Sequence, residues 1–395
     1  ESVLQKEIHN LQRGATDVTV IDRGPLWRTG GATSHAPGLV TRTSASRMMH
    51  SFADYTIGKL MAMDVDGQPC FHPVGSIEPA VSAERMAYLT RRSEFAESWG
   101  FSAAIITPDE AARLHPLIDP TVLVGAFHTT GEGVGKALRA AQAQGTRAQA
   151  HGARFIGDTA VTAILSSDGH ITGVQTTGGV IAADIVVLAA GAWGKGLAAT
   201  AGIVLPLVAM EHQYAITEPV SALAPYRDAD ASLPIVRFWE GGVYVRDEGE
   251  RAGVGSFNHR ALMRSDAEMV ANCATPDPSK FPLTEPEWQA GWEATTHVMP
   301  TLRDRTLVDA YNGVFPYSPD GLPIMGESPQ LPGLWTLECL WATHSVGAAR
   351  SLAQAILGQR PDIDFAAADL SRFDEVELVR ADYEQRCDNA YVDTY

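Results

Sequence analysis

Val18-Thr19-Val20-Ile21-Asp22 and the loop Thr29-Gly30-Gly31-Ala32-Thr33-Ser34-His35-Ala36-Pro37-Gly38-Leu39-Val40 decide how the 395-residue chain folds. The first run is apolar and continuous, as in a buried parallel strand, and it ends in a carboxylate. A carboxylate at the end of such a strand can accept hydrogen bonds from both hydroxyls of a ribose. The stretch therefore predicts a dinucleotide-binding α/β domain with Asp22 as a cofactor-binding residue, and a solvated strand end is the alternative for Asp22.

The glycine loop that should precede this strand is expected to be missing. A G-x-G-x-x-G motif belongs about 20 residues before Asp22, and that position falls at Ser2-Val3-Leu4. Two other glycine clusters are rejected. Gly253-Val254-Gly255 has no third glycine, and Gly131 to Lys136 lacks the first glycine and the hydroxyl residue of a phosphate loop, so we expect a turn that opens a helix there.

Hydrophobic periodicity divides the remaining chain into α/β ends and a β-rich middle. Helical spacing occurs at 4–14, 45–64, 82–98, 135–150, 287–297 and 346–357, and strand-like runs occur at 155–164, 171–177, 179–188, 211–217, 234–239, 243–247 and 334–340. The polar stretch 264–286 predicts a loop. This order predicts an α/β fold in which a discontinuous Rossmann-like domain, without its glycine-loop strand, carries an inserted mixed or antiparallel β-sheet domain. The expected ranges are 1–45, 130–205 and 305–360 for the first domain, 46–129 and 206–304 for the inserted domain, and 361–395 for a C-terminal linker.

Composition excludes several classes of function. The net charge is −17 and no basic run exists, which argues against nucleic acid or an anionic membrane surface as a partner. No apolar stretch of about 18 residues predicts a membrane span. The four cysteines lie far apart, so neither a zinc site nor a disulfide framework is expected, and a reducing cytoplasm fits best.

The loop from Thr29 to Val40 resembles the dimethylglycine oxidase and sarcosine dehydrogenase branch of the D-amino-acid oxidase superfamily, which carries G-G-[SA]-T-x-H-A-x-G-L at this place. Similar segments run through nearly the whole chain: Met210 to Tyr214, Leu233 to Arg237, Val243 to Arg246, Asn312 to Phe315, Pro319 to Pro323, Gly326-Glu327 and Thr343 to Gly347.

The resemblance implies FAD and the oxidation of an N-methyl amine such as N,N-dimethylglycine or sarcosine. Hydride transfer to the flavin would give an iminium ion and then formaldehyde. A tetrahydrofolate-binding domain that takes up the one-carbon unit, or an electron acceptor, would lie outside this chain. The alternatives are a non-catalytic regulatory or flavin-free binding subunit and, third, an oxidase of primary amines.

The resemblance also implies which residues surround the cofactor. His35 matches the site of covalent flavin attachment, and the alternative is a loop histidine bonded to the backbone. N–H groups of the helix that follows Thr343 could stabilise negative charge on the reduced flavin. The other cofactor-binding residues that it implies are Gly30, Thr33, Ser34, Val161, Ala190, Gly191, Trp193, Asn312, Gly313, Thr343, His344 and Ser345.

His212 and Tyr244 match the active-site pair of this branch. The period of two in a strand places His212 and Tyr214 on one face, and Tyr244 and Arg246 on one face. Antiparallel strands could bring these side chains together above a flavin, with His212 as the proton acceptor for the amine and Tyr244 orienting the substrate. A satisfied His–Tyr pair is the alternative. Arg246 and Arg237 are candidates for binding a substrate carboxylate, with ion pairs to Glu240, Asp247 or Glu248 as the alternative.

Overall fold

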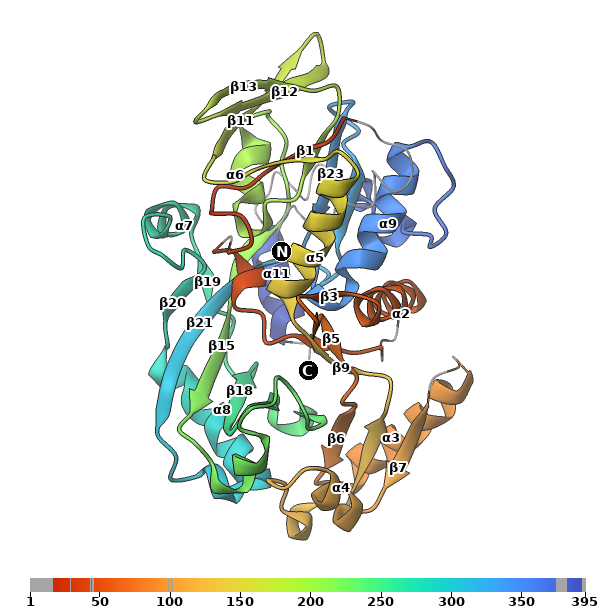
Figure 1. Ribbon diagram of the computed structural model, residues 1–395, viewed down its shortest axis with the longest axis vertical. Coiled ribbons are helices and arrows are strands. Elements are labelled where there is room, and N and C mark those ends of the chain that lie inside the picture. The colour runs from red at the N-terminus through yellow and green to blue at the C-terminus, as the bar shows by residue number, and fades with distance from the viewer. Residues whose placement is uncertain are drawn as a thin grey trace.

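The computed structural model describes residues 17–28, 30–42, 44, 46–98, 100, 102–373 and 382–392. The helix expected at 4–14 lies outside these residues. The described chain forms a mixed α/β fold, in which small sheets and helices make the upper part of Figure 1 and one large sheet makes the lower part. The predicted fold class, with a mixed β-sheet region inserted between α/β segments, is confirmed.

The large sheet has the strand order β20-β21-β15-β18-β17-β16-β6-β8-β7, and β19 pairs with β15. Neighbouring strands are antiparallel except for β16 and β6, which are parallel. The strands predicted at 211–217 and in the hairpin 234–239/243–247 are confirmed. The strands are β6 (Ser76–Ala80), β7 (Ala103–Ile106), β8 (Gly125–Thr129), β15 (Val208–Thr217), β16 (Ile235–Phe238), β17 (Val243–Glu248), β18 (Arg251–Ser256), β19 (Met263–Arg264), β20 (Lys280–Pro282) and β21 (Leu307–Tyr317).

The two faces of this sheet have different surroundings. Helix α8 (Glu285–Val298) packs its Trp288 into an apolar cluster with Val243, Val245 and Val254. Because side chains alternate along a strand, the residues between these valines face the other side. That other face carries Tyr244 and is the face on which the predicted site residues gather.

Smaller sheets lie outside the large sheet, and several of them contain strands from the ranges predicted for the dinucleotide-binding domain. Strand β1 pairs in parallel with β10, and β14 pairs in parallel with β23, which is antiparallel to β22. The single strands predicted at 155–164 and 179–188 are wrong, because each divides into two strands that join different sheets. Asp158, with φ of 51°, lies in the first break. The strands are β1 (Thr19–Ile21), β2 (Leu39–Val40), β3 (Asp64–Val65), β4 (Gln68–Pro69), β5 (Phe71–His72), β9 (Gly133–Gly135), β10 (Arg154–Ile156), β11 (Val161–Ser167), β12 (His170–Thr176), β13 (Gly179–Ala182), β14 (Val186–Leu188), β22 (Ile324–Glu327) and β23 (Leu334–Glu338).

The helices expected near 45–64, 82–98, 135–150, 287–297 and 346–357 are confirmed, whereas the loop expected at 264–286 is wrong. Helix α7 begins there after a capping box, in which Ser265 and Glu268 bond each other's backbone N–H. Within the described ranges no helix is long and apolar enough to cross a membrane. The remaining α-helices are α2 (Arg47–Met61), α3 (Ala83–Ser98), α4 (Pro108–Leu114), α5 (Ala137–Ala150), α6 (Gly194–Ala199), α7 (Asp266–Asn272), α9 (Ser345–Ile356) and α11 (Asp382–Val392).

Candidate active site

A buried histidine–tyrosine pair lies on one face of the large sheet. Nε2 of His212 on β15 is 2.8 Å from the phenol oxygen of Tyr244 on β17, and the two rings stack with centroids 5.5 Å apart. Strand β18 lies between their strands, so an antiparallel arrangement does bring the two side chains together. Burial, with smaller contributions from His259 and His35, holds the pKa of His212 well below its usual value, and the imidazole is therefore neutral.

Two glycines on β18 make room for the tyrosine rings. A Cβ atom at Gly255 would lie 2.0 Å from Cζ of Tyr244, and one at Gly253 would lie 2.0 Å from the phenol oxygen of Tyr214. Neither position can carry a side chain while the rings stay where they are. The sequence pattern of these glycines was rejected above as an incomplete G-x-G-x-x-G motif, and their role in the site was not predicted. Their signal is two glycines spaced by two residues in a strand, which marks a close approach.

His35 ends the glycine-rich loop that resembles the flavin attachment loop. The loop forms a short 3-10 turn, η1 (Ala32–Ser34), directly before His35. The hydroxyl of Ser34 accepts a hydrogen bond from the N–H of Gly30 at 2.9 Å and donates one to the carbonyl of Arg28 at 2.8 Å. These bonds hold the turn closed. The predicted residues Gly30 and Ser34 therefore shape the loop that presents His35.

The His35 ring lies on the large sheet beside the histidine–tyrosine pair. A Cβ atom at Gly313 on β21 would lie 2.6 Å from Cε1 of His35, so the ring rests against the backbone at that glycine. Its edge meets the Tyr311 ring, with centroids 5.7 Å apart. Burial, and then the ammonium group of Lys280, lower the pKa of His35 to about 3, which leaves a neutral imidazole. Sequence analysis did not identify Lys280 or Tyr311.

One aromatic cavity of about 90 Å³ is lined by both His35 and His212. Nε2 of His35 and Nδ1 of His212 are buried and have no hydrogen-bond partner within the described part of the chain. Two such nitrogens beside one cavity fit a site that a ligand completes. Ligand sites usually measure about 300–1,000 Å³, so a ligand as large as a tricyclic ring would fit here only if the aromatic walls moved apart.

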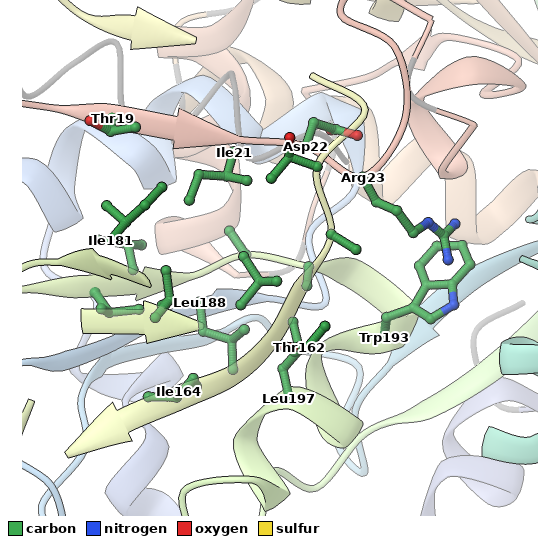
Figure 2. A pocket seen from close by; sticks show the side chains of 18 of the residues that line it. Thr19, Ile21, Asp22, Arg23, Thr162, Ile164, Ile181, Leu188, Trp193 and Leu197 are labelled. Carbon is green, nitrogen blue, oxygen red and sulfur yellow. The ribbon is translucent and has the colours of Figure 1, made fainter. Parts of the chain in front are cut away.

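A larger cavity of about 890 Å³ lies among β1, β11, β14 and α6, and its size is within the range of ligand sites. Figure 2 shows Asp22 at the end of β1 above the apolar side chains of Ile164 and Leu188. Oδ1 of Asp22 accepts the N–H of Gly24 at 2.8 Å, but burial outweighs this bond and raises the pKa of Asp22 to about 6. The lining includes four of the predicted cofactor-binding residues, Asp22, Val161, Ala190 and Trp193.

The backbone at Ala190 and Gly191 is already bonded within the protein. The buried carboxylate of Glu338 accepts the N–H of Ala190 at 2.6 Å and that of Gly191 at 2.8 Å. A cofactor therefore receives neither of these two N–H donors in this conformation. Sequence analysis did not identify Glu338, which lies 147 residues from Gly191 along the chain and gives no local signal.

Asn312, predicted to bind the cofactor, lies on the opposite face of β21 from the His35 cavity. Its side-chain nitrogen donates to Glu211 at 2.8 Å and to the hydroxyl of Thr284 at 2.7 Å. Neighbouring residues in a strand point to opposite faces, so Gly313 faces His35 and Asn312 does not. The structure thus corrects the prediction for the Asn312 side chain.

The segment Thr343 to Ser345 connects the 3-10 turn η7 (Ala342–His344) to α9. The hydroxyl of Thr343 donates to the carbonyl of Leu39, and the hydroxyl of Ser345 donates to that of Ala342. Burial lowers the pKa of His344 to about 4, and its Nδ1 has no partner among the described residues. Ala342, which directly precedes this segment, lines the aromatic cavity, whereas Thr343, His344 and Ser345 are not among its lining residues. Thr33, the remaining predicted loop residue, lines the same cavity.

Both predicted carboxylate-binding arginines are paired with glutamates. Arg246 forms an ion pair with Glu248, which is one of the alternatives that the sequence left open, and its Nε is 3.4 Å from the phenol oxygen of Tyr214. Arg237 pairs with the buried Glu132 at 3.5 Å, a partner that the sequence did not indicate. Nη1 of Arg246 is buried and has no hydrogen-bond partner in the described ranges, so one donor of this side chain remains for a ligand.

Comparison with curated proteins finds relatives over most of the chain. The chain is 28% identical over 378 residues to "4-methylaminobutanoate oxidase (formaldehyde-forming)" of Paenarthrobacter nicotinovorans, which covers 92% of this chain and 43% of that protein. It is 25% identical over 381 residues to mitochondrial sarcosine dehydrogenase of Homo sapiens, covering 92% of this chain and 39% of that one. The chain therefore spans about two fifths of the length of these relatives.

Solved structures and a family model agree with these relatives. The L-proline dehydrogenase from P. horikoshii superimposes with a TM-score of 0.79 at 20% identity, over 94% of each chain, which shows the same fold. The model for the family "DAO: FAD dependent oxidoreductase" matches residues 8–355, which is most of the 395 residues. The resemblance drawn from the loop around His35 is thereby confirmed, and the chain belongs to the family of FAD-dependent oxidoreductases.

Proposed function

We propose that the protein oxidises an N-methyl amine of the dimethylglycine or sarcosine type with a flavin that is covalently bound to His35. One observation carries this proposal: His35 and His212 line the same cavity, and His212 is paired with Tyr244. Two relatives, a 4-methylaminobutanoate oxidase and a sarcosine dehydrogenase, support the same class of substrate.

The residues around the two cavities fit FAD. The larger cavity would take the adenosine end, where Asp22 can accept the ribose hydroxyls. The aromatic cavity would take the flavin ring. There Nε2 of His35, which has no hydrogen-bond partner in the described part of the chain, is a neutral nucleophile suited to a covalent link. When bound, the flavin supplies a two-electron acceptor for the hydride of the N-methyl group.

The side chains of the sheet would prepare the amine for oxidation. Only a neutral amine has the lone pair that drives hydride loss, and the neutral His212 ring can accept the proton of an ammonium substrate. Tyr244, 2.8 Å from Nε2, would hold that ring and orient the amine. Nη1 of Arg246, which has no hydrogen-bond partner among the described residues, is the candidate donor for the substrate carboxylate. Hydrolysis of the iminium product would give formaldehyde and the demethylated amine. If a folate-binding domain is present elsewhere, its tetrahydrofolate would take up the one-carbon unit instead.

The test begins with the colour of the purified protein. We expect a yellow protein whose flavin stays with the polypeptide after acid precipitation, and a His35→Ala variant whose flavin is released by acid. Anaerobic addition of sarcosine, N,N-dimethylglycine or 4-methylaminobutanoate should bleach the flavin, whereas glycine, a primary amine, should not. Colourless protein that binds no added FAD would refute the proposal and favour a non-catalytic subunit. Bleaching by glycine alone would favour a primary-amine oxidase.

A further inference from the structure

Helix α11 (Asp382–Val392) packs on the face of β15 that carries His212, although it lies after the last residue that the family model matches. The residues Tyr383, Cys387 and Tyr391 are spaced by four, which places them on one face of the helix. All three are buried in a cluster with Val208 and Met210 of β15. The expected linker at 361–395 therefore contains a helix that is part of the folded core (Figure 1).

Tyr391 connects this helix to the strand that carries His212. Its side chain is only 1% exposed, and its hydroxyl donates to the backbone carbonyl of Glu211 at 3.2 Å. The same hydroxyl lies 3.1 Å from Nε2 of His259. Glu211 directly precedes His212, so this bond fixes the backbone at the proposed proton acceptor.

A second contact reaches the His212 ring itself. The ring centroids of Tyr391 and Phe257 are 5.9 Å apart, and those of Phe257 and His212 are 4.0 Å apart. Phe257 also lies 6.1 Å from the Tyr244 ring. The Phe257 ring thus contacts both the Tyr391 ring and the histidine–tyrosine pair.

We propose that Tyr391 is a positioning residue for His212, so that helix α11 belongs to the catalytic unit. Tyr391 acts through the carbonyl of Glu211 and through the ring of Phe257. This inference rests on the proposed role of His212 as proton acceptor.

The test compares Tyr391→Phe, which removes only the hydroxyl, with Tyr391→Leu, which also removes the ring. Tyr383→Phe is the matched control, because it removes a buried tyrosine hydroxyl from the same helix face. The Tyr383 ring faces Lys195, whose Nζ lies 5.4 Å from the ring centroid, and not the proposed active site. The full-length flavin-loaded protein carries ¹⁵N-labelled histidine, and the His212 signal is assigned by its loss in His212→Gln.

We expect Tyr391→Phe to shift the His212 ring signals and to lower kcat about three- to tenfold, as for the loss of one hydrogen bond, with less than a twofold change in KM. Tyr391→Leu should do more, and Tyr383→Phe should leave the His212 signals and kcat unchanged. The groups near His212 that titrate, His35, His259 and Tyr244, remain in every variant.

Unchanged His212 signals and kcat in Tyr391→Phe overturn the proposal, and so do equal effects in Tyr383→Phe. If Tyr391→Leu does not fold, Tyr391→Phe alone decides. If His212→Gln keeps full activity, the proposed proton acceptor is wrong, but the NMR comparison still decides whether Tyr391 positions the His212 ring.

Discussion

The replacement Gly255→Ala tests how the sheet builds its site. The new Cβ atom would lie 2.0 Å from Cζ of Tyr244, while carbon atoms normally approach to about 3.5–4.0 Å. The Tyr244 ring must therefore move by about 1.5 Å. A hydrogen bond of 2.8 Å to His212 does not survive such a movement, because bonds weaken steeply beyond about 3.2 Å.

The energetic cost of the substitution follows from the loss of this hydrogen bond. A buried ring nitrogen of His212 without its partner costs about 1–3 kcal/mol, which corresponds to a fall of about 5- to 150-fold in the rate of amine oxidation if the contact persists in the transition state. Overpacking of the sheet should lower the free energy of unfolding by about 1–3 kcal/mol. Flavin bleaching in a stopped-flow instrument and urea unfolding measure the two effects.

A double-mutant cycle separates the steric effect from a general disturbance of β18. In a Tyr244→Ala background the ring is gone, so Gly255→Ala should cost little further rate or stability. Gly58→Ala is the control, because Gly58 is exposed on α2 with no atom within 4 Å of the added Cβ, and we expect a small gain in stability of about 0.5–1 kcal/mol. The reasoning is refuted if Gly255→Ala costs as much in the Tyr244→Ala background as in the wild type.

Three further changes have defined outcomes. Asp22→Asn should stabilise the flavin-free protein at pH 7 by at most about 3 kcal/mol, because folding raises the pKa of Asp22 from 3.8 to about 6 and each pKa unit corresponds to ~1.4 kcal/mol. The same variant should bind FAD more weakly. Urea unfolding and FAD titration measure the two effects, and a variant whose flavin-free form is less stable would contradict this expectation. Gly313→Ala places a Cβ 2.6 Å from Cε1 of His35 and should reduce the acid-stable flavin fraction without preventing folding, as absorbance after acid precipitation would reveal. Burial lowers the pKa of His115 from 6.5 to about 4, so the unfolded chain binds more protons than the folded one between these values, and stability is lost as the pH falls from 6.5 toward 4. His115→Leu should flatten that decline in urea unfolding at a series of pH values, although Asp22 contributes the opposite slope between pH 3.8 and about 6. An unchanged pH dependence would exclude His115 as a cause.

Patterns that repeat within a short segment were predictable from the sequence. The period of two identified β15 and the β16–β17 hairpin, and it placed His212 and Tyr244 on faces that could meet. The capping box of Ser265 and Glu268 is an equally local signal, and it was overlooked because the surrounding segment is polar.

Partners that lie far apart in the sequence were not predictable. Glu132 neutralises Arg237 across 105 residues, and Glu338 binds the Ala190 backbone across 148. A sequence states which residues carry charge, but only the fold states which charges meet. The functional assignment of Arg237 therefore depended on a distance that no local pattern contains.

Three glycines on neighbouring strands make room for the aromatic rings of the candidate site. Tyr244 lies over Gly255, Tyr214 over Gly253, and His35 over Gly313, so each ring occupies space that a side chain would otherwise fill. Strand register places all three glycines on the same face of the sheet, and a slip by one residue would turn them to the other face. The chemistry is therefore tied to the register of β15, β18 and β21. A residue of a neighbouring helix that bonds the backbone of such a strand, as Tyr391 does at Glu211, can influence the position of the side chains that the strand carries.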